Sequence, residues 1–189
     1  VMPPPQQQQR VPVGTQVQLR PAQAQAVKWA HVLSIGLNAS YALFPQHLGD
    51  DLGPEGPFLA WTGYQASDSV GKGGTNVTLL GSFSETEPLV LQPCGYSDFG
   101  LHHIAPIHKL SKLAFLGKLG KWVPTAAARV VSITDSAAPS LQVVIVGVPA
   151  ETVALAFAAS AAGPVIVATC KVGAAGTLTA EFNGKTATC

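Results

Sequence analysis

Three of the five histidines in this 189-residue chain lie within seven residues of one another. They are His102, His103 and His108, and they follow shortly after Cys94 and Asp98. Imidazole and thiolate are good ligands for transition metals, so this cluster is the first candidate for chemistry. Adjacent histidines on an extended chain point to opposite faces, however, and one ion could not reach both without a bend. Because a glycine and a proline frame the histidines, we expect a plain surface loop without a metal, with a pH-sensitive contact as the alternative.

Positive charge gathers in the same part of the chain. Seven of the ten acids lie between Asp50 and Asp98, whereas residues 99–134 contain no acid. The bases of this acid-free segment are Lys109, Lys112, Lys118, Lys121 and Arg129. Such a segment suits phosphate groups, because each neutralised phosphate releases condensed counterions. We therefore predict that these five residues contact nucleic acid, with a merely solvated basic edge as the alternative.

The lysines do not indicate a membrane-surface helix. On a helix over residues 107–121 they would fall on different sides, whereas a membrane-surface helix gathers them on one side. Gly117 and Gly120 weaken a helix further. The chain has no run of about 18 apolar residues, so we expect no membrane span.

Other motifs give no catalytic signal. Residues 71–75, Gly-Lys-Gly-Gly-Thr, are similar to a phosphate-binding loop, but the glycine that a P-loop needs five residues before Gly71 is missing. Gly73 and Gly74 instead predict a hairpin turn. There is no Gly-x-Ser-x-Gly motif, and no catalytic group of side chains can be placed from spacing. We expect neither an enzyme nor a cofactor.

The cysteines and two asparagines bear on the cellular compartment. The chain has three cysteines, an odd number that excludes a fully paired set of intrachain disulfides. We expect Cys94 and Cys170 to be small buried side chains, and the sequence gives no role to Cys189. Glycosylation sequons begin at Asn38 and Asn76, and they matter only if the chain is secreted.

The composition is that of a globular protein with little charge. Hydrophobic residues make up 47% of the chain and charged residues only 11%, against about 25% in a typical domain. A surface so poor in charge is weakly protected against association. This argues for a protein whose surface is largely covered by partners, such as further copies of itself.

The N-terminal part contains mixed signals. Residues 1–12, rich in Pro and Gln, predict a flexible extended arm, and 13–189 predict one domain behind it. Alternation of apolar and polar residues predicts a strand over 13–19. Residues 22–37 fit either a helix or a strand, and the Pro- and Gly-rich stretch after them predicts a loop. Further short strands are predicted at Phe58–Tyr64, Asn76–Phe83 and Leu89–Leu91.

Strand signals are clearest in the C-terminal third, where Val, Ile and Thr dominate. Strand-like segments recur there about every 10 residues, as in a β-sandwich or barrel. They are Arg129–Thr134, Leu141–Val148, Val153–Phe157, Pro164–Val172 and Gly176–Phe182. A short helix from Glu151 into Ala158–Ala162 is the alternative for one stretch. The expected fold class is all-β.

An all-β domain with a Pro-rich arm, little charge and a local basic segment resembles the jelly-roll coat proteins of small icosahedral RNA viruses. In style it is closest to tymovirus coat proteins, and the string Trp61-Thr62-Gly63-Tyr64 is similar to one in some bromovirus coat proteins. The resemblance implies a β-sandwich of about eight strands with short helices in loops. It also implies a virion shell of identical subunits, assembled in the host cytoplasm around RNA. The chain departs from bromovirus coats in lacking an Arg/Lys-rich N-terminus. The alternative is a secreted or surface β-sandwich that binds a ligand or mediates adhesion.

Overall fold

The computed structural model describes residues 13–19, 27–48, 52, 57–63 and 76–189. These residues form fourteen β-strands and one 3-10 helix, η1 (Pro45–Leu48), so the all-β prediction is confirmed. The expected arm at 1–12 and the Gly73-Gly74 turn lie outside the described residues. Within the described part, no helix is long and apolar enough to cross a bilayer.

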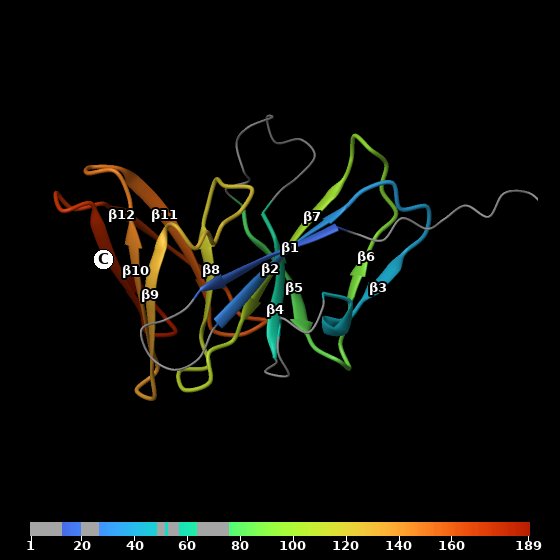
Figure 1. The fold of residues 1–189 in the computed structure, drawn as a ribbon. Coiled ribbons are helices and arrows are strands. Elements are labelled where there is room, and N and C mark those ends of the chain that lie inside the picture. Colours follow the sequence, from blue (N-terminus) through green and yellow to red (C-terminus); the bar gives the residue numbers. More distant parts are fainter. Residues whose placement is uncertain (1–12, 20–26, 49–51, 53–56, 64–75) are drawn as a thin grey trace, which may run out of the picture.

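A five-stranded antiparallel sheet occupies the middle of the molecule (Figure 1). Its strands, in spatial order, are β1 (Val13–Leu19), β2 (Val27–Ser34), β7 (Gly100–Pro106), β4 (Phe58–Thr62) and β5 (Thr78–Phe83). β7 has β2 on one side and β4 on the other, so it is the central strand of the sheet. The order brings together segments that are far apart in the sequence.

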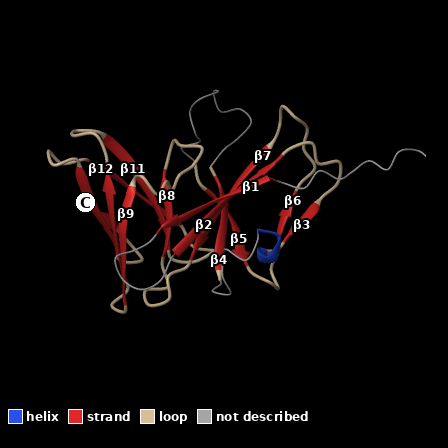
Figure 2. Ribbon diagram, in the orientation of Figure 1, coloured by secondary structure: helices blue, strands red, loops and turns tan. Residues whose placement is uncertain are grey.

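A two-stranded ribbon packs beside this sheet, with η1 next to it (Figure 2). It consists of β3 (Tyr41–Leu43) and β6 (Leu89–Leu91). Side chains from the ribbon and from one face of the five-stranded sheet form a separate hydrophobic cluster. Its largest buried members include Leu43, Leu91, Phe58, Phe83 and Ile104.

The C-terminal half forms two further antiparallel sheets. One has the order β12 (Val165–Lys171), β11 (Thr152–Ala158), β8 (Ala114–Lys118). The other has the order β14 (Ala187–Thr188), β13 (Thr177–Phe182), β10 (Ser140–Val146), β9 (Val130–Ser136). They form the side of the molecule opposite the β3–β6 ribbon (Figure 1).

The strands β8 and β11 are buried on both faces. Residues 113–117 and 155–158 are buried without interruption, whereas a strand with one wet face would alternate. On β2, the Trp29 indole donates a hydrogen bond to the carbonyl oxygen of Phe115 on β8, at 2.8 Å. Phe115 contacts Phe157, which in turn stacks on Phe182 of β13, with ring centroids 5.3 and 5.2 Å apart. The main core therefore runs from the five-stranded sheet through β8 and β11 to the last sheet.

The strands predicted in the C-terminal third are confirmed, with boundaries shifted by one or two residues. The ambiguous segment 22–37 contains the strand β2, and the possible helix into Ala158–Ala162 is instead the end of β11 followed by a turn. The expected loop around His102 and His103 is wrong, because these residues lie in β7. Its glycine and proline stand at the two ends of the strand, where they do not interrupt the hydrogen-bonded ladder.

The cysteine expectation is also partly wrong. Cys170 is buried, as expected, but it forms a disulfide with Cys189, with the two Cα atoms 5.8 Å apart. Cys170 lies on β12 of one sheet, and Cys189 follows β14 of another. The bond thus joins two sheets that share no backbone ladder. Cys94 is the free cysteine of the described residues.

We expect the substitution C189S to lower the free energy of unfolding by about 3 kcal/mol, because the bond restricts the unfolded chain over a loop of about 20 residues. Urea unfolding without reductant measures the difference. Reductant should bring the wild type down to the stability of C189S and leave C189S unchanged. The matched control C94S should keep the response of the wild type to reductant. Equal stability of reduced and oxidised wild type would contradict the prediction.

Candidate functional site

The five predicted basic residues do not form one patch. Lys118 and Arg129 come together on opposite sides of Glu151, with nitrogen–oxygen distances of 2.5 and 2.9 Å. Arg129 also donates to the carbonyl oxygen of Val146, at 3.2 Å. Hydrogen bonds lower the pKa of Glu151 to about 2. The bond from Arg129 has the largest effect, followed by those from Lys118 and from the N–H of Val148. The charges of Lys118 and Arg129 are therefore offset by a carboxylate from outside the acid-free segment.

The other three lysines are exposed, at the two ends of β8. Lys109 and Lys112 lie in the turn between β7 and β8, where Lys112 has a φ of 62°. Asp135 on β9 holds this turn by accepting hydrogen bonds from the N–H groups of Leu110 and Ser111, both at 2.8 Å. Lys121 lies in the loop that follows the other end of the strand. A five-residue strand spans roughly 17 Å, which separates the two groups of lysines.

A pair of histidines sits in the core next to this loop. His31 on β2 and His103 on β7 are register partners, and their Nδ1 atoms lie 2.8 Å apart. Both side chains are at most 5% exposed, and Thr125 Oγ1 lies 3.3 Å from Nε2 of His31. Trp61 on β4 packs against the His103 ring, with centroids 4.3 Å apart. His103 belongs to the histidine group that the sequence singles out, whereas His31 is 72 residues away and is not predicted by that group.

Burial keeps the pair neutral. Burial lowers the pKa of His31 to about 4 and that of His103 to about 3. The neighbouring His31 and His102 lower the pKa of His103 further. At neutral pH one Nδ1 therefore carries a hydrogen and donates it to the other ring. The arrangement is a buried hydrogen bond between two uncharged imidazoles.

The remaining members of the expected histidine cluster lie elsewhere. As expected from strand geometry, His102 points to the face of β7 opposite His103, and burial lowers its pKa. His108 is buried near Trp29, and burial lowers its pKa to about 4 although Asp135 acts against the shift. Cys94 donates instead to the carbonyl of Ser34. In the described ranges, no three His, Cys, Asp or Glu side chains are grouped so as to hold a metal ion.

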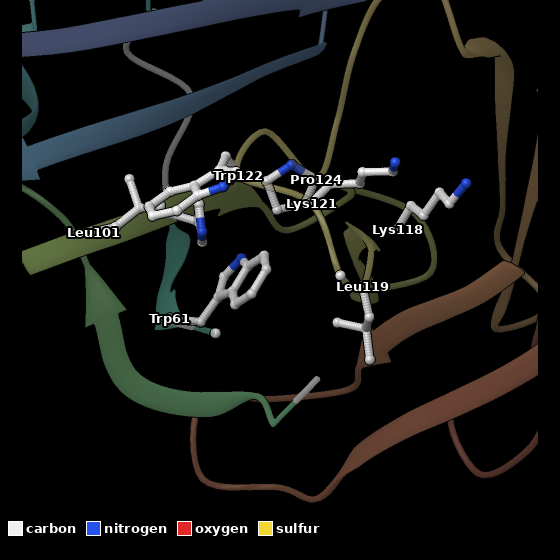
Figure 3. A pocket seen from close by; sticks show the side chains of 10 residues that line it. Trp61, Leu101, Lys118, Leu119, Lys121, Trp122 and Pro124 are labelled. Carbon is white, nitrogen blue, oxygen red and sulfur yellow. The ribbon is translucent and has the colours of Figure 1, made fainter. Parts of the chain in front are cut away.

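A small pocket opens beside the histidine pair (Figure 3). Its cavity volume is about 10 Å³, close to the space of a single water molecule. Trp61 and His103 line it from the sheet, and Lys118, Lys121 and Trp122 line it from the end of β8 and the following loop. The sequence predicts Lys118 and Lys121 as site residues but not the two tryptophans, whose proximity depends on the path of the loop.

Gly117 allows the loop to return over β8. The N–H of Lys118 donates to the carbonyl oxygen of Pro124, at 2.9 Å, which closes the loop. A Cβ atom at Gly117 would lie 2.6 Å from Cβ of Pro124, and the φ of Gly117 is 121°, a region that glycine adopts most readily. The two glycines that argued against a helix thus belong to a strand and its loop. Trp122 then packs at a tilt against Phe99, with ring centroids 5.8 Å apart and an interplanar angle of 30°.

Comparison with protein-family models, with curated proteins and with solved structures found no match to this chain.

We expect the free energy of unfolding to fall by roughly 2 kcal/mol per buried histidine between pH 6.5 and pH 5, for His31, His103 and His108. Their pKa values of about 4, 3 and 4 lie below the ordinary 6.5 of the unfolded chain. The unfolded state therefore binds more protons across this window, so stability is full above pH 6.5 and declines as the pH falls. Urea unfolding at both pH values measures the effect.

The substitution H108L should remove one histidine's share of this pH dependence. An equal free energy of unfolding at pH 6.5 and pH 5 in the wild type would show that the three histidines are not held neutral.

Proposed function

We propose that the chain is a structural protein that assembles with copies of itself, as a coat protein forming an icosahedral shell around RNA. The observation that carries this proposal is that strands at the edges of the sheets expose large hydrophobic side chains. β5, β9 and β12 each stand at one end of a sheet, and each carries a large exposed hydrophobic side chain. These are Leu80, Val131 and Val167, which are 43, 53 and 46% exposed.

Edge strands pair readily with further strands unless another segment covers them. Monomeric proteins usually protect them with charge, proline or a covering segment. β5 carries no charged residue, and the chain as a whole has only 11% charged residues. Association through these edge strands would cover the exposed apolar side chains. The proposal includes a jelly-roll arrangement of the core, with about eight strands.

RNA contact is the second part of the proposal. Lys109, Lys112 and Lys121 are exposed, whereas Lys118 and Arg129 share Glu151. We assign the electrostatic contact with phosphate mainly to the first three residues. The expected location is the virion.

We expect the purified chain to form uniform particles of tens of nanometres, visible by negative-stain microscopy and by light scattering after size exclusion. The double variant V131K/V167K adds a charge to each of two edge strands and should shift the protein toward a 19.4 kDa monomer. Q142K/T179K adds the same charge on the interior strands β10 and β13 and should assemble normally. A wild type that stays monomeric at high concentration would rule out the coat function.

A secreted or surface β-sandwich that binds a ligand is the second candidate. The Cys170–Cys189 disulfide favours it, because disulfides persist mainly in oxidising compartments. The two sequon asparagines, Asn38 and Asn76, are both exposed.

Secretion from a eukaryotic cell tests this candidate. If the chain is secreted in nature, we expect glycan on Asn38 or Asn76, seen as a mass increase that glycosidase treatment removes. The variant S40A/T78A destroys both sequons and should show no increase. A secreted wild type without glycan that assembles into shells would favour the coat function instead.

A further inference from the structure

A buried hydrogen-bond donor, the indole N–H of Trp61, lines the pocket beside β8. Trp61 is 1% exposed, and its Nε1 has no acceptor among the described residues. Leaving a buried N–H unpaired costs about 1–3 kcal/mol, so an acceptor is expected to reach it. Figure 3 shows the nitrogen on the side of the indole that faces Trp122 and Leu101, across the pocket.

The polar lining of the pocket consists mainly of donors. Among the described residues, Trp61, Lys118 and Lys121 line it together with His103, and no carboxylate or side-chain amide does. Lys118 is paired with Glu151, whereas Lys121 is exposed and has no ion pair among the described residues. Both lysine side chains extend to the same side of the tryptophans (Figure 3). The site therefore suits a ligand rich in acceptors, with negative charge on that side.

The size of the pocket limits how far the ligand enters. A cavity of about 10 Å³ holds a single oxygen atom or water, so the bulk of the ligand must stay at the mouth. There Trp122 is 36% exposed, and its ring is held against Phe99. An exposed indole fixed in this way is a platform on which a flat group can stack.

We propose that this pocket binds one nucleotide of single-stranded RNA. The base stacks on Trp122, a carbonyl oxygen of the base accepts the hydrogen bond of Trp61 Nε1, and the adjoining phosphate contacts Lys121. This inference rests on the proposed contact with RNA and specifies which residues bind the base and which bind the phosphate. A sugar fits less well, because its hydroxyl groups also need acceptors, and the described residues of the pocket offer no carboxylate or side-chain amide for them.

Fluorescence anisotropy with a labelled oligouridylate of eight nucleotides tests the proposal on the full chain. W122A should weaken binding about 5- to 100-fold, the range for loss of one base–aromatic stack, and W122F should restore most of it. K121Q should reduce the slope of log affinity against log salt by about 0.7, the value for one phosphate of a single strand. K185Q, at an exposed lysine of the turn after β13, is the matched control and should change neither quantity.

Two further ligands separate stacking from charge. An abasic oligomer with the same number of phosphates should bind 5- to 100-fold more weakly than the oligouridylate and should not respond to W122A. Polyglutamate should not compete at equal charge. Binding that is indifferent to W122A, or equal binding of the abasic oligomer or of polyglutamate, would overturn the site.

The test of this binding site can fail or succeed independently of the test of self-association. Particles that form normally but whose subunits bind the oligomer without any response to W122A and K121Q would overturn this site and leave the proposed self-association intact. Binding that depends on Trp122 in a chain that never assembles would support the site and overturn the coat function. Thermal unfolding of each variant, expected within a few degrees of the wild type, shows that the fold is retained.

Discussion

The burial of β8 and β11 on both faces is the constraint on which the rest of the structure depends. Every residue of these strands between 114 and 117 and between 155 and 158 is inside. A strand can be covered on both sides only if two other layers exist, so the five-stranded sheet and the last sheet are both required. The indole of Trp29 secures one side through its bond to the Phe115 carbonyl, and Phe182 packs on the other. Removing either layer would expose the most apolar part of the chain.

The histidine pair shows what this arrangement demands of polar groups. His31 and His103 face the main core, where burial disfavours a charged imidazole. The two imidazoles instead form a hydrogen bond with each other, and Thr125 lies within hydrogen-bond distance of the second nitrogen of His31. Two polar side chains are thus accommodated between apolar layers, at the point where the pocket with Trp61 begins.

The sequence predicted the fold class and most strands of the C-terminal third, because alternation and β-branched residues are local signals. It missed β7 and β8 for physical reasons. The histidines of β7 are polar residues in a buried central strand, which the hydrophobic pattern does not anticipate. β8 has only five residues, and the lysines and glycines in and around it, such as Lys112, Gly117, Lys118 and Gly120, dominated the pattern. The pairing of His31 with His103, the Cys170–Cys189 bond and the meeting of Trp61 with Trp122 all depend on the order of strands in space, which residue spacing does not encode.

The disulfide between Cys170 and Cys189 also determines how the C-terminal strands respond to mechanical load. Cys189 is joined covalently to β12, and β13 and β14 lie within the loop that the bond closes. A pulling force applied at residue 189 therefore passes through sulfur to β12 and not along the backbone of β14. The two-residue strand β14 could not resist such a force by its own ladder, since it pairs with β13 through only two register positions. The bond makes the seven-residue pairing of β12 with β11 the first element to bear the load.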